Sequence, residues 1–544
     1  MVNFPNRERF VVLPAGKRDI NRRKDQTKML KRVKSHLHFF PTSILEKSVL
    51  SPKHEKYKIM GSNAIFPLML SFFLALAAAL QATSFVNAAD WPVFLHDFAH
   101  TGNQYAETGI SVTKAARMQK LWSVNTKGTI AASPIVVGTS VYVGSWDGYM
   151  YAFSRDTGVP NWKTYLGKTH NLNKTCIPQN PGISATAQMY KGVLYVPGGD
   201  RYFYALNPVT GVVLWKTPVY TSKVPGDYYN WASTVIIPIN GIPYAFIGLA
   251  SLCDNPLVPG QLLQINLKTH TITKRFTVNF DHNNKPQIGG GIWTTPAIDT
   301  TTNPPTIYVT TGTPNGNQTH SRAVLAINAL TMTLLGNWHV PNSEIANTPD
   351  PDFGSSPTLF SSSTGTPLVV AGHKNGYLYA INRRTLIANG PDPINPVNAL
   401  AWKTQIAIGG ENPQGGDGVL STPVFVVNPY NNTKTLYAAG GKDPSTHSGG
   451  EVRAINPDTG AVRWTHDTSG TVLASMAYTN GVLIDASTTY TKGTLELLKA
   501  SNGTVLKSFT LPGGVYSAPV ISHGMVFVGA NDGSLNAFAM PVKP

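Results

Sequence analysis

Residues 147–162, DGYMYAFSRDTGVPNW, are followed at residues 200–215 by a near copy, DRYFYALNPVTGVVLW. Each copy leads from an aromatic segment through an alanine to a Thr-Gly turn, and a tryptophan stands four residues after the glycine. Fainter copies continue to the end of the chain. A pattern that returns roughly every fifty residues predicts repeated units, each of which stacks against its neighbours to bury a core.

Each repeat contains four short segments with the composition of β-strands. In the first repeat these are ASPIVV (132–137), SVYVGS (140–145), YMYAFS (149–154) and PNWKTY (160–165). They alternate or run apolar, as half-buried and buried strands do, and glycine-containing turns separate them. The 544-residue chain has 49 Gly, 40 Pro and only 13% charged residues, which is typical of an all-β protein with many tight turns.

Eight such units fit the chain. The small residue that opens each inner strand marks them, at Ser133, Ala185, Ser233, Thr295, Ser356, Thr422, Ser475 and Ala518. Outer-strand tryptophans stand at Trp162, Trp215, Trp338, Trp402 and Trp464. We expect each to pack beneath the turn of the neighbouring blade, where one ring buries about 150–250 Å². The alanine before the turn is expected to leave room for the ring.

The eighth unit stops after residues 531–540 and has no outer strand of its own. Residues 119–126, QKLWSVNT, form an orphan outer strand that carries Trp122 ahead of the first complete unit. Pairing of the two chain ends would close a ring and remove its exposed edges. The sequence therefore predicts an eight-bladed β-propeller of four-stranded antiparallel blades, closed by an N-terminal strand. Seven blades is the alternative if the third or seventh unit is assigned wrongly.

The residues before the propeller have the composition of a leader. Residues 1–59 are basic and form either a disordered extension or the product of a start placed upstream of Met60. Residues 60–88 have the arrangement of a signal peptide, with lysines before the apolar run 64–80 and small residues that suit cleavage after Ala88. A retained membrane anchor is the alternative. We expect residues 89–544 to form the propeller outside the cytoplasm, at a membrane only if the leader is uncleaved.

Charge and motif content exclude several classes of function. The formal charge is +16, of which residues 1–59 supply +10 through 15 Lys and Arg against 5 Asp and Glu. The remainder shows no basic patch with interleaved aromatic residues, so we expect no nucleic-acid partner. The chain has no Cys-x-x-Cys-His segment, which excludes covalently attached haem, and no cluster of histidines with metal-ligand spacing.

The pattern Ala-x-x-x-x-Thr-Gly-x-x-x-Trp at residues 152–162, 205–215 and 454–464 resembles the tryptophan-docking motif of pyrroloquinoline-quinone (PQQ) repeats. The resemblance covers residues 90–540. Residues 289–316, GGGIWTTPAIDTTTNPPTIYVTTGTPNG, most resemble quinoprotein alcohol dehydrogenases, including poly(vinyl alcohol) dehydrogenase-like proteins. The motif is specific for the fold, but non-catalytic scaffold propellers carry the same repeats.

The resemblance implies a cofactor site, which we transfer residue by residue. Trp293 matches the tryptophan that forms the floor under the quinone, and Asp299 follows six residues later as in the family pattern. The family places a calcium-binding Asn in a Thr-Gly-Asn turn, where this chain has Thr313, a neutral and weaker oxygen donor. Asn315 could replace it if the loop is shifted.

The resemblance also implies two acidic positions. For the second calcium ligand, a Glu in the family, residues 251–260 offer Asp254 or Asn255, and a turn-forming role is the alternative. Asp352 is the candidate for the catalytic base, with Asp350 nearby, although an aspartate that opens a blade also makes a good turn cap.

The vicinal disulfide that covers the quinone in this family is absent. Its two positions correspond to Thr175 and Cys176, and the only other cysteine is Cys253. In an exported protein with two cysteines a disulfide between them is expected, and their loops would emerge on the same face of adjacent blades. A Cys176–Cys253 bond would stabilise the fold by about 2–4 kcal/mol.

Two functions remain open. The first is an exported quinoprotein-type dehydrogenase that oxidises a small alcohol or a polymer, with PQQ and calcium above Trp293 and Asp352 as base. The second is a non-catalytic propeller that binds a partner protein or a polymer such as polysaccharide. Trp293, Asp299 and Asp352 favour the first. Thr313, the missing Glu and the missing cysteine pair favour the second.

Overall fold

The computed structural model describes residues 89–541, apart from residues 108, 346, 347, 349, 393–395, 411–414, 448 and 490. The expected extension 1–59 and signal peptide 60–88 lie outside the described residues. Within the described part, no helix has the length and apolar character needed to cross a membrane.

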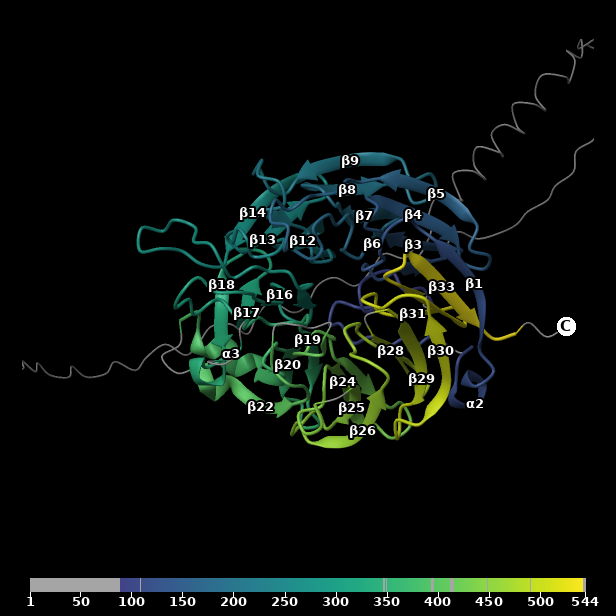
Figure 1. The fold of residues 1–544 in the computed structure, drawn as a ribbon. Coiled ribbons are helices and arrows are strands. Elements are labelled where there is room, and N and C mark those ends of the chain that lie inside the picture. Colours follow the sequence, from purple (N-terminus) through teal and green to yellow (C-terminus); the bar gives the residue numbers. More distant parts are fainter. Residues whose placement is uncertain are drawn as a thin grey trace, which may run out of the picture. The chain divides into compact units, whose positions relative to one another are not determined.

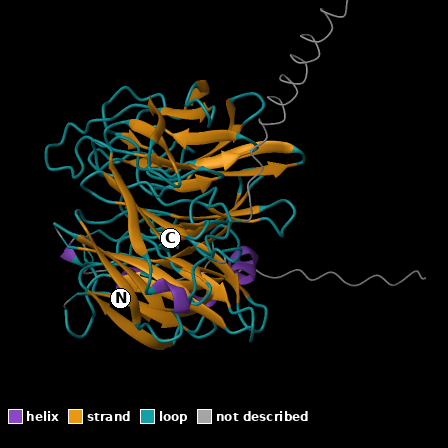
Figure 2. Ribbon diagram, turned by 90° about the vertical axis from the view of Figure 1, so that its right-hand side faces the viewer, coloured by secondary structure: helices purple, strands orange, loops and turns teal. Residues whose placement is uncertain are grey.

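Eight antiparallel sheets follow one another around a ring, and nearly all regular structure is strand (Figures 1 and 2). Blades 1 and 2 contain β2 (Ile135–Val137), β3 (Ser140–Gly144), β4 (Tyr149–Ser154), β5 (Pro160–Tyr165), β6 (Gln188–Tyr190), β7 (Val193–Pro197), β8 (Tyr202–Leu206) and β9 (Val213–Pro218). Blades 3 and 4 contain β11 (Val235–Ile239), β12 (Ile242–Ser251), β13 (Gln261–Asn266), β14 (Thr271–Thr277), β15 (Ala297–Asp299), β16 (Thr306–Thr310), β17 (Ala323–Asn328) and β18 (Leu334–His339).

Blades 5 to 7 continue the same order. They contain β19 (Thr358–Ser361), β20 (Pro367–Gly372), β21 (Tyr377–Asn382), β22 (Leu400–Gln405), β23 (Val424–Val427), β24 (Lys434–Gly440), β25 (Gly450–Ile455), β26 (Val462–Thr468), β27 (Ala477–Thr479), β28 (Val482–Thr488), β29 (Gly493–Lys499) and β30 (Val505–Leu511). The prediction of an eight-bladed propeller is therefore confirmed.

The last blade combines both ends of the propeller sequence. It contains β31 (Val520–Ser522), β32 (Met525–Gly529), β33 (Ser534–Ala539) and β1 (Gln119–Asn125). β1 pairs antiparallel with β33 (Figure 1). In this pairing Trp122 lies opposite Ala537. The orphan strand of the sequence thus supplies the missing outer strand, and inner strand β31 contacts β2 of the first blade.

The hydrophobic core lies between blades because each strand sends alternate side chains to opposite faces of its sheet. In β16, Ile307 and Val309 pack against blade 3, whereas Tyr308 between them packs against blade 5. No blade has a core of its own, so each is stabilised by the two blades beside it.

The repeated tryptophans explain the motif that opens the sequence. The indole N–H of Trp122, Trp162, Trp402 and Trp464 donates to a carbonyl in the turn of the following blade, at 2.8–3.2 Å. The glycine of that turn has a positive φ, and a Cβ on it would come within 2.6–2.9 Å of the indole ring. The alanine expected to make room for the ring is instead the cross-strand partner of its own blade's tryptophan, as Ala152 is of Trp162. The room in the neighbouring blade comes from the glycine.

Four elements depart from the repeat, and all belong to the part of the chain from blade 3 to blade 5. β10 (Tyr228–Tyr229) adds a short strand to β12. The 3-10 helix η1 (Asn342–Glu344) precedes blade 5, and α3 (Arg383–Asn389) with the 3-10 helix η2 (Pro396–Ala399) replaces its outer turn. The remaining helix, α2 (Val112–Ala115), precedes β1.

An N-terminal segment, residues 90–104, runs across the inner strands and joins most of the blades. Its backbone is hydrogen-bonded to Val136, Met189, Ile298, Leu359, Phe425 and Tyr478, which belong to blades 1, 2, 4, 5, 6 and 7. Each of these partners lies three residues after the Ser or Thr that precedes its inner strand, which is Ser133, Thr186, Thr295, Ser356, Thr422 or Ser475. The segment therefore crosses one end of the central channel.

Candidate functional site

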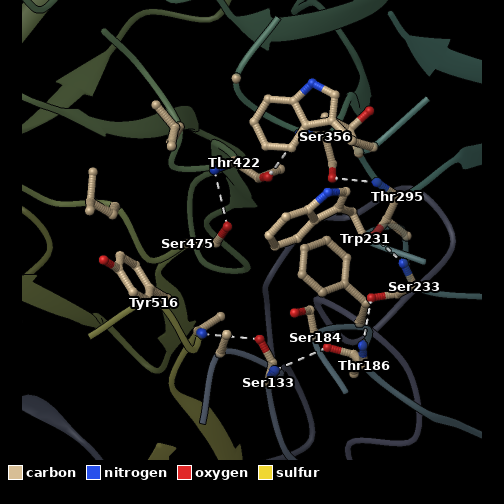
Figure 3. A pocket seen from close by; sticks show the side chains of 18 of the residues that line it. Ser133, Ser184, Thr186, Trp231, Ser233, Thr295, Ser356, Thr422, Ser475 and Tyr516 are labelled. Carbon is tan, nitrogen blue, oxygen red and sulfur yellow. Dashed lines mark hydrogen bonds between the residues drawn. The ribbon is translucent and has the colours of Figure 1, made fainter. Parts of the chain in front are cut away.

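A belt of hydroxyl groups surrounds the channel axis (Figure 3). In seven blades, a Ser or Thr hydroxyl accepts the backbone N–H of the equivalent residue in the preceding blade, at 2.9–3.2 Å. The belt consists of Ser133, Thr186, Ser233, Thr295, Ser356, Thr422 and Ser475, with Ala518 in the eighth blade. Thr186 occupies the position that the sequence analysis assigned to Ala185, which was wrong by one residue. A hydroxyl is needed there to bind the neighbouring backbone.

A cavity of about 490 Å³ lies within this belt. The residue two positions before each belt residue lines it, and these are Ala131, Ser184, Trp231, Trp293, Gly354, Leu420, Leu473 and Tyr516. Phe94 of the N-terminal segment and the pair Ile177–Pro178 complete much of the wall. Among the residues that the structure describes, no Asp, Glu, Lys, Arg or His lines the cavity. The cavity thus combines aromatic faces with hydroxyl groups and carries no formal charge.

Beside Trp293, three aspartates from blades 3 and 5 converge. Asp254 comes from the β12–β13 loop of blade 3, and Asp350 and Asp352 precede β19 of blade 5. One carboxylate oxygen of each lies within 4.8 Å of the other two. Asp352 is buried, Asp350 is half-buried, and Asp254 lies at the exposed edge. This set is the acidic cluster.

The hydroxyl of Thr313, which follows β16, lies within hydrogen-bond distance of all three aspartates of the acidic cluster. Its hydroxyl lies 2.5 Å from Asp254 Oδ2, 2.9 Å from Asp352 Oδ1 and 3.3 Å from Asp350 Oδ1. A hydroxyl has a single proton and can donate to only one of these oxygens at a time. The other carboxylate oxygens therefore need a different positive partner.

Lys374 supplies part of that positive charge. Its ammonium group pairs with Asp350 and lies 3.4 Å from Asp352 Oδ2 and 5.3 Å from the centroid of the Trp293 ring. Burial alone would lower the pKa of Lys374, but the carboxylates of Asp352 and Asp350 raise it above its ordinary value. Lys374 is therefore a permanent cation. When all three aspartates are ionised, they and Lys374 together carry a net charge of −2.

The same charges, together with burial, give Asp352 a pKa near neutral pH. Burial raises the pKa of Asp352 to about 7, assisted by the charges of Asp350 and Asp254 and opposed by Lys374. Gly312 allows this carboxylate to approach the tryptophan, because a Cβ on Gly312 would lie 3.2 Å from Asp352 Oδ2 and 3.3 Å from Trp293 Cδ1. Asp352 can therefore accept or release a proton close to pH 7 beside an aromatic face.

His373 fixes the Asp-Pro-Asp segment. Its Nδ1 accepts the backbone N–H of Asn375 at 3.0 Å, so the ring proton lies on Nε2 and is donated to the Pro351 carbonyl at 3.1 Å. Burial lowers the pKa of His373 to about 3, which keeps the ring neutral. The Lys374 backbone N–H also binds the Asp352 carbonyl, at 2.9 Å. The two aspartates are thus held by backbone contacts as well as by charge.

A disulfide joins Cys176 to Cys253, the pair that the sequence analysis predicted. It connects the loop entering blade 2 with the β12–β13 loop of blade 3. Cys176 packs with Tyr229, Leu252 and Trp231 at the side of the cavity. Thr175, its neighbour, is exposed.

The structure brings together most of the predicted site residues. Trp293, Asp254, Thr313, Asp350 and Asp352 all lie in one region.

Asn315 and Asp299 lie apart from this region. In the described residues, the Asn315 side chain makes no hydrogen bond to the three aspartates, and its backbone N–H binds Gln318 Oε1 at 2.9 Å. Asp299 forms an ion pair with Arg383 of α3, which gives it a structural partner on the outer side of blade 5.

Lys374 is the residue that sequence reasoning missed. It stands between a buried strand and an Asn-Gly turn, where a lysine is ordinarily exposed, yet it is buried. Its partners lie more than twenty residues away in sequence, so no local pattern connects them. The only signal was the lysine at the position before the Asn-Gly turn of blade 5.

Comparisons with known proteins extend the resemblance. A PQQ-repeat family model, described as outer membrane protein assembly factor BamB, matches residues 106–232 and 448–540. The polyvinylalcohol dehydrogenase of Sphingopyxis sp. is 25% identical over 346 residues, which cover 57% of this chain and 49% of that protein. The chain thus spans about half the length of this relative. The tetrathionate hydrolase of Acidithiobacillus ferrooxidans is 22% identical over 383 residues, which cover 67% of this chain and 66% of that protein.

A solved structure supports the fold. The quinohemoprotein alcohol dehydrogenase from Comamonas testosteroni superposes with a TM-score of 0.63 and 17% identity, over 86% of this chain and 84% of that chain. The eight sheets, the docking tryptophans and these matches agree. The chain is an eight-bladed β-propeller that matches the PQQ-repeat family model over part of its length and resembles the quinoprotein alcohol dehydrogenases.

Proposed function

We propose that the protein is an exported quinoprotein-type dehydrogenase that oxidises uncharged alcohols. The observation that carries this proposal is the convergence of Asp254, Asp350 and Asp352 on the single hydroxyl of Thr313, beside Lys374 and Trp293.

The acidic cluster fits a hard cation. Its net charge of −2 matches a divalent ion, and its donors are carboxylate and hydroxyl oxygens, which Ca²⁺ prefers. Asp254, Asp350 and Thr313 would hold the cation, and Asp352 would lie beside it as the base. The weak donor Thr313 in place of the family's Asn is offset by Asp350, which adds a third carboxylate.

The cavity fits a planar quinone. Trp293 offers an aromatic face, and its buried indole N–H has no hydrogen-bond partner among the described residues. Ile177 and Pro178 form part of the same wall, and the Lys374 ammonium lies close enough to Trp293 to donate to a quinone oxygen. When bound, PQQ would supply the carbonyl that accepts hydride, and the cation would polarise that carbonyl.

The chain's own residues would manage the proton. Asp352 has a pKa of about 7, close to the value at which a general base is most effective near neutral pH. It would take the hydroxyl proton of the alcohol, while Lys374 stays protonated and remains paired with Asp350. The hydroxyl and aromatic groups that line the cavity would offer hydrogen bonds and apolar contacts to a neutral alcohol.

Location and partners follow from the same proposal. The leader at residues 60–88 supports export, and the lack of a haem-attachment motif implies a separate electron acceptor. The substrate is a small alcohol or a hydroxylated polymer.

One finding favours a binding propeller as the second candidate. The family model described as BamB matches residues 106–232 and 448–540, which exclude every member of the acidic cluster. The matched blades therefore resemble an assembly factor. The acidic cluster, Thr313 and Lys374 all lie in the part of the chain that this family model does not match.

Titration of the purified protein with PQQ and Ca²⁺ tests the first candidate. We expect quinone absorbance to be retained after gel filtration, together with alcohol-dependent dye reduction. The Ca²⁺-dependent dye reduction should disappear in Asp352→Asn. It should persist in Asp281→Asn, a control in an exposed turn. A protein that retains no quinone at any Ca²⁺ concentration would leave the binding propeller as the function.

A further inference from the structure

The loop at residues 171–181 is attached to the residue before Asp254 and to the residue after it. The residue before Asp254 is Cys253, which is bonded to Cys176. The residue after it is Asn255, whose carbonyl accepts Asn171 Nδ2 at 3.3 Å. Both tethers come from the loop that enters blade 2, whereas Asp254 belongs to blade 3.

The β12–β13 loop has few other attachments at this point. Its backbone is anchored at Leu252, which binds the Asp227 carbonyl at 3.2 Å, and at Val258, which binds Ser251 Oγ at 3.0 Å. Between these anchors, two described attachments hold this stretch of the loop, and both come from the 171–181 loop. They are the disulfide at Cys253 and the hydrogen bond to the Asn255 carbonyl. Asp254 itself has a φ of 51°, a conformation that costs energy in a non-glycine residue. Its position therefore depends on what its neighbours are attached to.

The same loop forms the cavity wall. Ile177 and Pro178 directly follow Cys176 and line the cavity, and Cys176 packs against Trp231 and Tyr229. Asn171 is buried and also donates to the Gly226 carbonyl at 2.9 Å. One loop thus connects the cavity wall with one ligand of the acidic cluster.

We propose that the Cys176–Cys253 disulfide and Asn171 are positioning residues for the cation site, and that reduction of the disulfide weakens cation binding by releasing Asp254. The inference rests on the cation site of the proposed function, but not on quinone or catalysis. In the reducing step an external dithiol gives two electrons to the disulfide and becomes a disulfide itself, and both cysteine sulfurs become thiols. The site would then be sensitive to the redox state of its surroundings.

Terbium(III) luminescence, sensitised by the nearby Trp293, measures the cation site in the full chain without PQQ. We expect the dissociation constant of Tb³⁺ to rise about tenfold on reduction with a dithiol, as for other contacts that orient metal ligands. The Cys176→Ser/Cys253→Ser variant should show the same rise without reductant. Asn171→Ala should show a smaller rise, and it keeps the proposal testable if the serine variant does not fold.

Asn230→Ala is the matched control. Like Asn171, Asn230 is a buried amide between blades 2 and 3 that donates to two backbone carbonyls, here Gly198 and Asp200, each at 2.9 Å. It does not border Asp254. Its loss should lower the unfolding temperature about as much as the loss of Asn171 and leave Tb³⁺ affinity unchanged.

A double-mutant cycle with Asp254→Asn identifies the route of the effect. In that background, opening the disulfide should change Tb³⁺ affinity by less than about twofold. Equal affinity of oxidised and reduced protein, or the same fold-change with and without Asp254, would overturn the proposal while leaving the proposed function intact. Oxidised protein that binds no Tb³⁺ would overturn both. Tb³⁺ binding with the expected redox effect but no dye reduction with PQQ would contradict only the proposed dehydrogenase.

Discussion

The tryptophan docks and the acidic cluster are built in opposite ways. At each dock one tryptophan, one glycine and one carbonyl repeat the same contact, and four blades show it with an N–H to carbonyl distance of 2.8–3.2 Å. The acidic cluster occurs once, uses side chains from three successive blades, and has no equivalent elsewhere in the described residues.

This difference suggests that the docks serve stability, whereas the acidic cluster serves ligand binding and catalysis. The dock satisfies every group that it buries, so it stabilises the ring and leaves nothing for a ligand. The acidic cluster keeps an excess of negative charge and gathers three carboxylates around one hydroxyl proton, which is costly unless a cation joins them. Substitutions at the docks should therefore change folding, and substitutions in the cluster should change binding and turnover.

The largest expected effect follows the removal of the proposed base. Asp352→Asn should lower the turnover of alcohol with PQQ and Ca²⁺ by about 10³-fold, as loss of a general base does. The amide keeps the size of the side chain, so the unfolding temperature should change little. Steady-state dye reduction and calorimetric unfolding measure the two effects. Turnover within tenfold of wild type would show that another group takes the proton.

Much of the fold could be predicted because the repeat is local. The motif that runs from the alanine through the Thr-Gly turn to the tryptophan spans only eleven residues, so it can be recognised locally. Eight units and one orphan outer strand then imply a closed ring. The error at Ala185 arose because two adjacent small residues fit the same position. Sequence could not tell that Thr186, and not Ala185, supplies the hydroxyl that binds the next blade.

The candidate site could be predicted only in part. Trp293, Asp254, Thr313 and Asp352 were found through the family resemblance, which gives their spacing. Lys374 was not found, because its role depends on carboxylates that meet it only in the folded ring. Asn315 looked like a suitable donor in sequence, yet its side chain makes no hydrogen bond to the aspartates in the described structure.

A matched pair of glycines tests the dock. Gly460 and Gly241 both have a φ of 75°, but a Cβ on Gly460 would come within 2.7 Å of the Trp402 ring, whereas one on Gly241 would meet nothing within 4 Å. Gly241→Ala should cost about 1 kcal/mol of unfolding free energy from the backbone alone, and Gly460→Ala about 2 kcal/mol more. Denaturant unfolding measures both. Equal losses would mean that the tryptophan contact contributes little.

Lys374→Met tests the charge balance of the cluster. Lys374 lowers the pKa of Asp352, so its removal should raise that pKa above the present value of about 7. The negative charge of Asp352 beside the cation favours Ca²⁺ binding. As the pH is lowered, Ca²⁺ affinity should therefore begin to fall at a pH about one unit higher than in wild type. Calorimetric titrations between pH 5.5 and 9 measure the shift. An unchanged pH profile would place Lys374 outside the cluster's electrostatics.

Substitution of Asp485 is expected to have no effect on the cation site. This aspartate is buried between regular blades, and neither carboxylate oxygen has a hydrogen-bond partner in the described structure. Burial raises the pKa of Asp485 well above its ordinary value of 3.8, with Glu496 adding to the shift. Between those pKa values the unfolded chain releases a proton that the folded chain keeps, so stability falls as pH rises through the window.

Asp485→Asn removes that titration. The slope of unfolding free energy against pH should become less negative by up to about 1.4 kcal/mol per pH unit within the window. Ca²⁺ affinity should equal that of wild type. A loss of Ca²⁺ binding in this variant would mean that a buried carboxylate in a regular blade also serves the site, and would weaken the separation between the two regions.

Calorimetric titration of Ca²⁺ into the full chain tests the central claim most directly. We predict one binding event per chain in wild type and in Asp281→Asn. Asp254→Asn/Asp350→Asn should bind no Ca²⁺, because it removes two of the three carboxylates and leaves the Asp352–Lys374 pair in place. Ca²⁺ binding of undiminished affinity in that double variant, or no binding heat in wild type, would contradict the account.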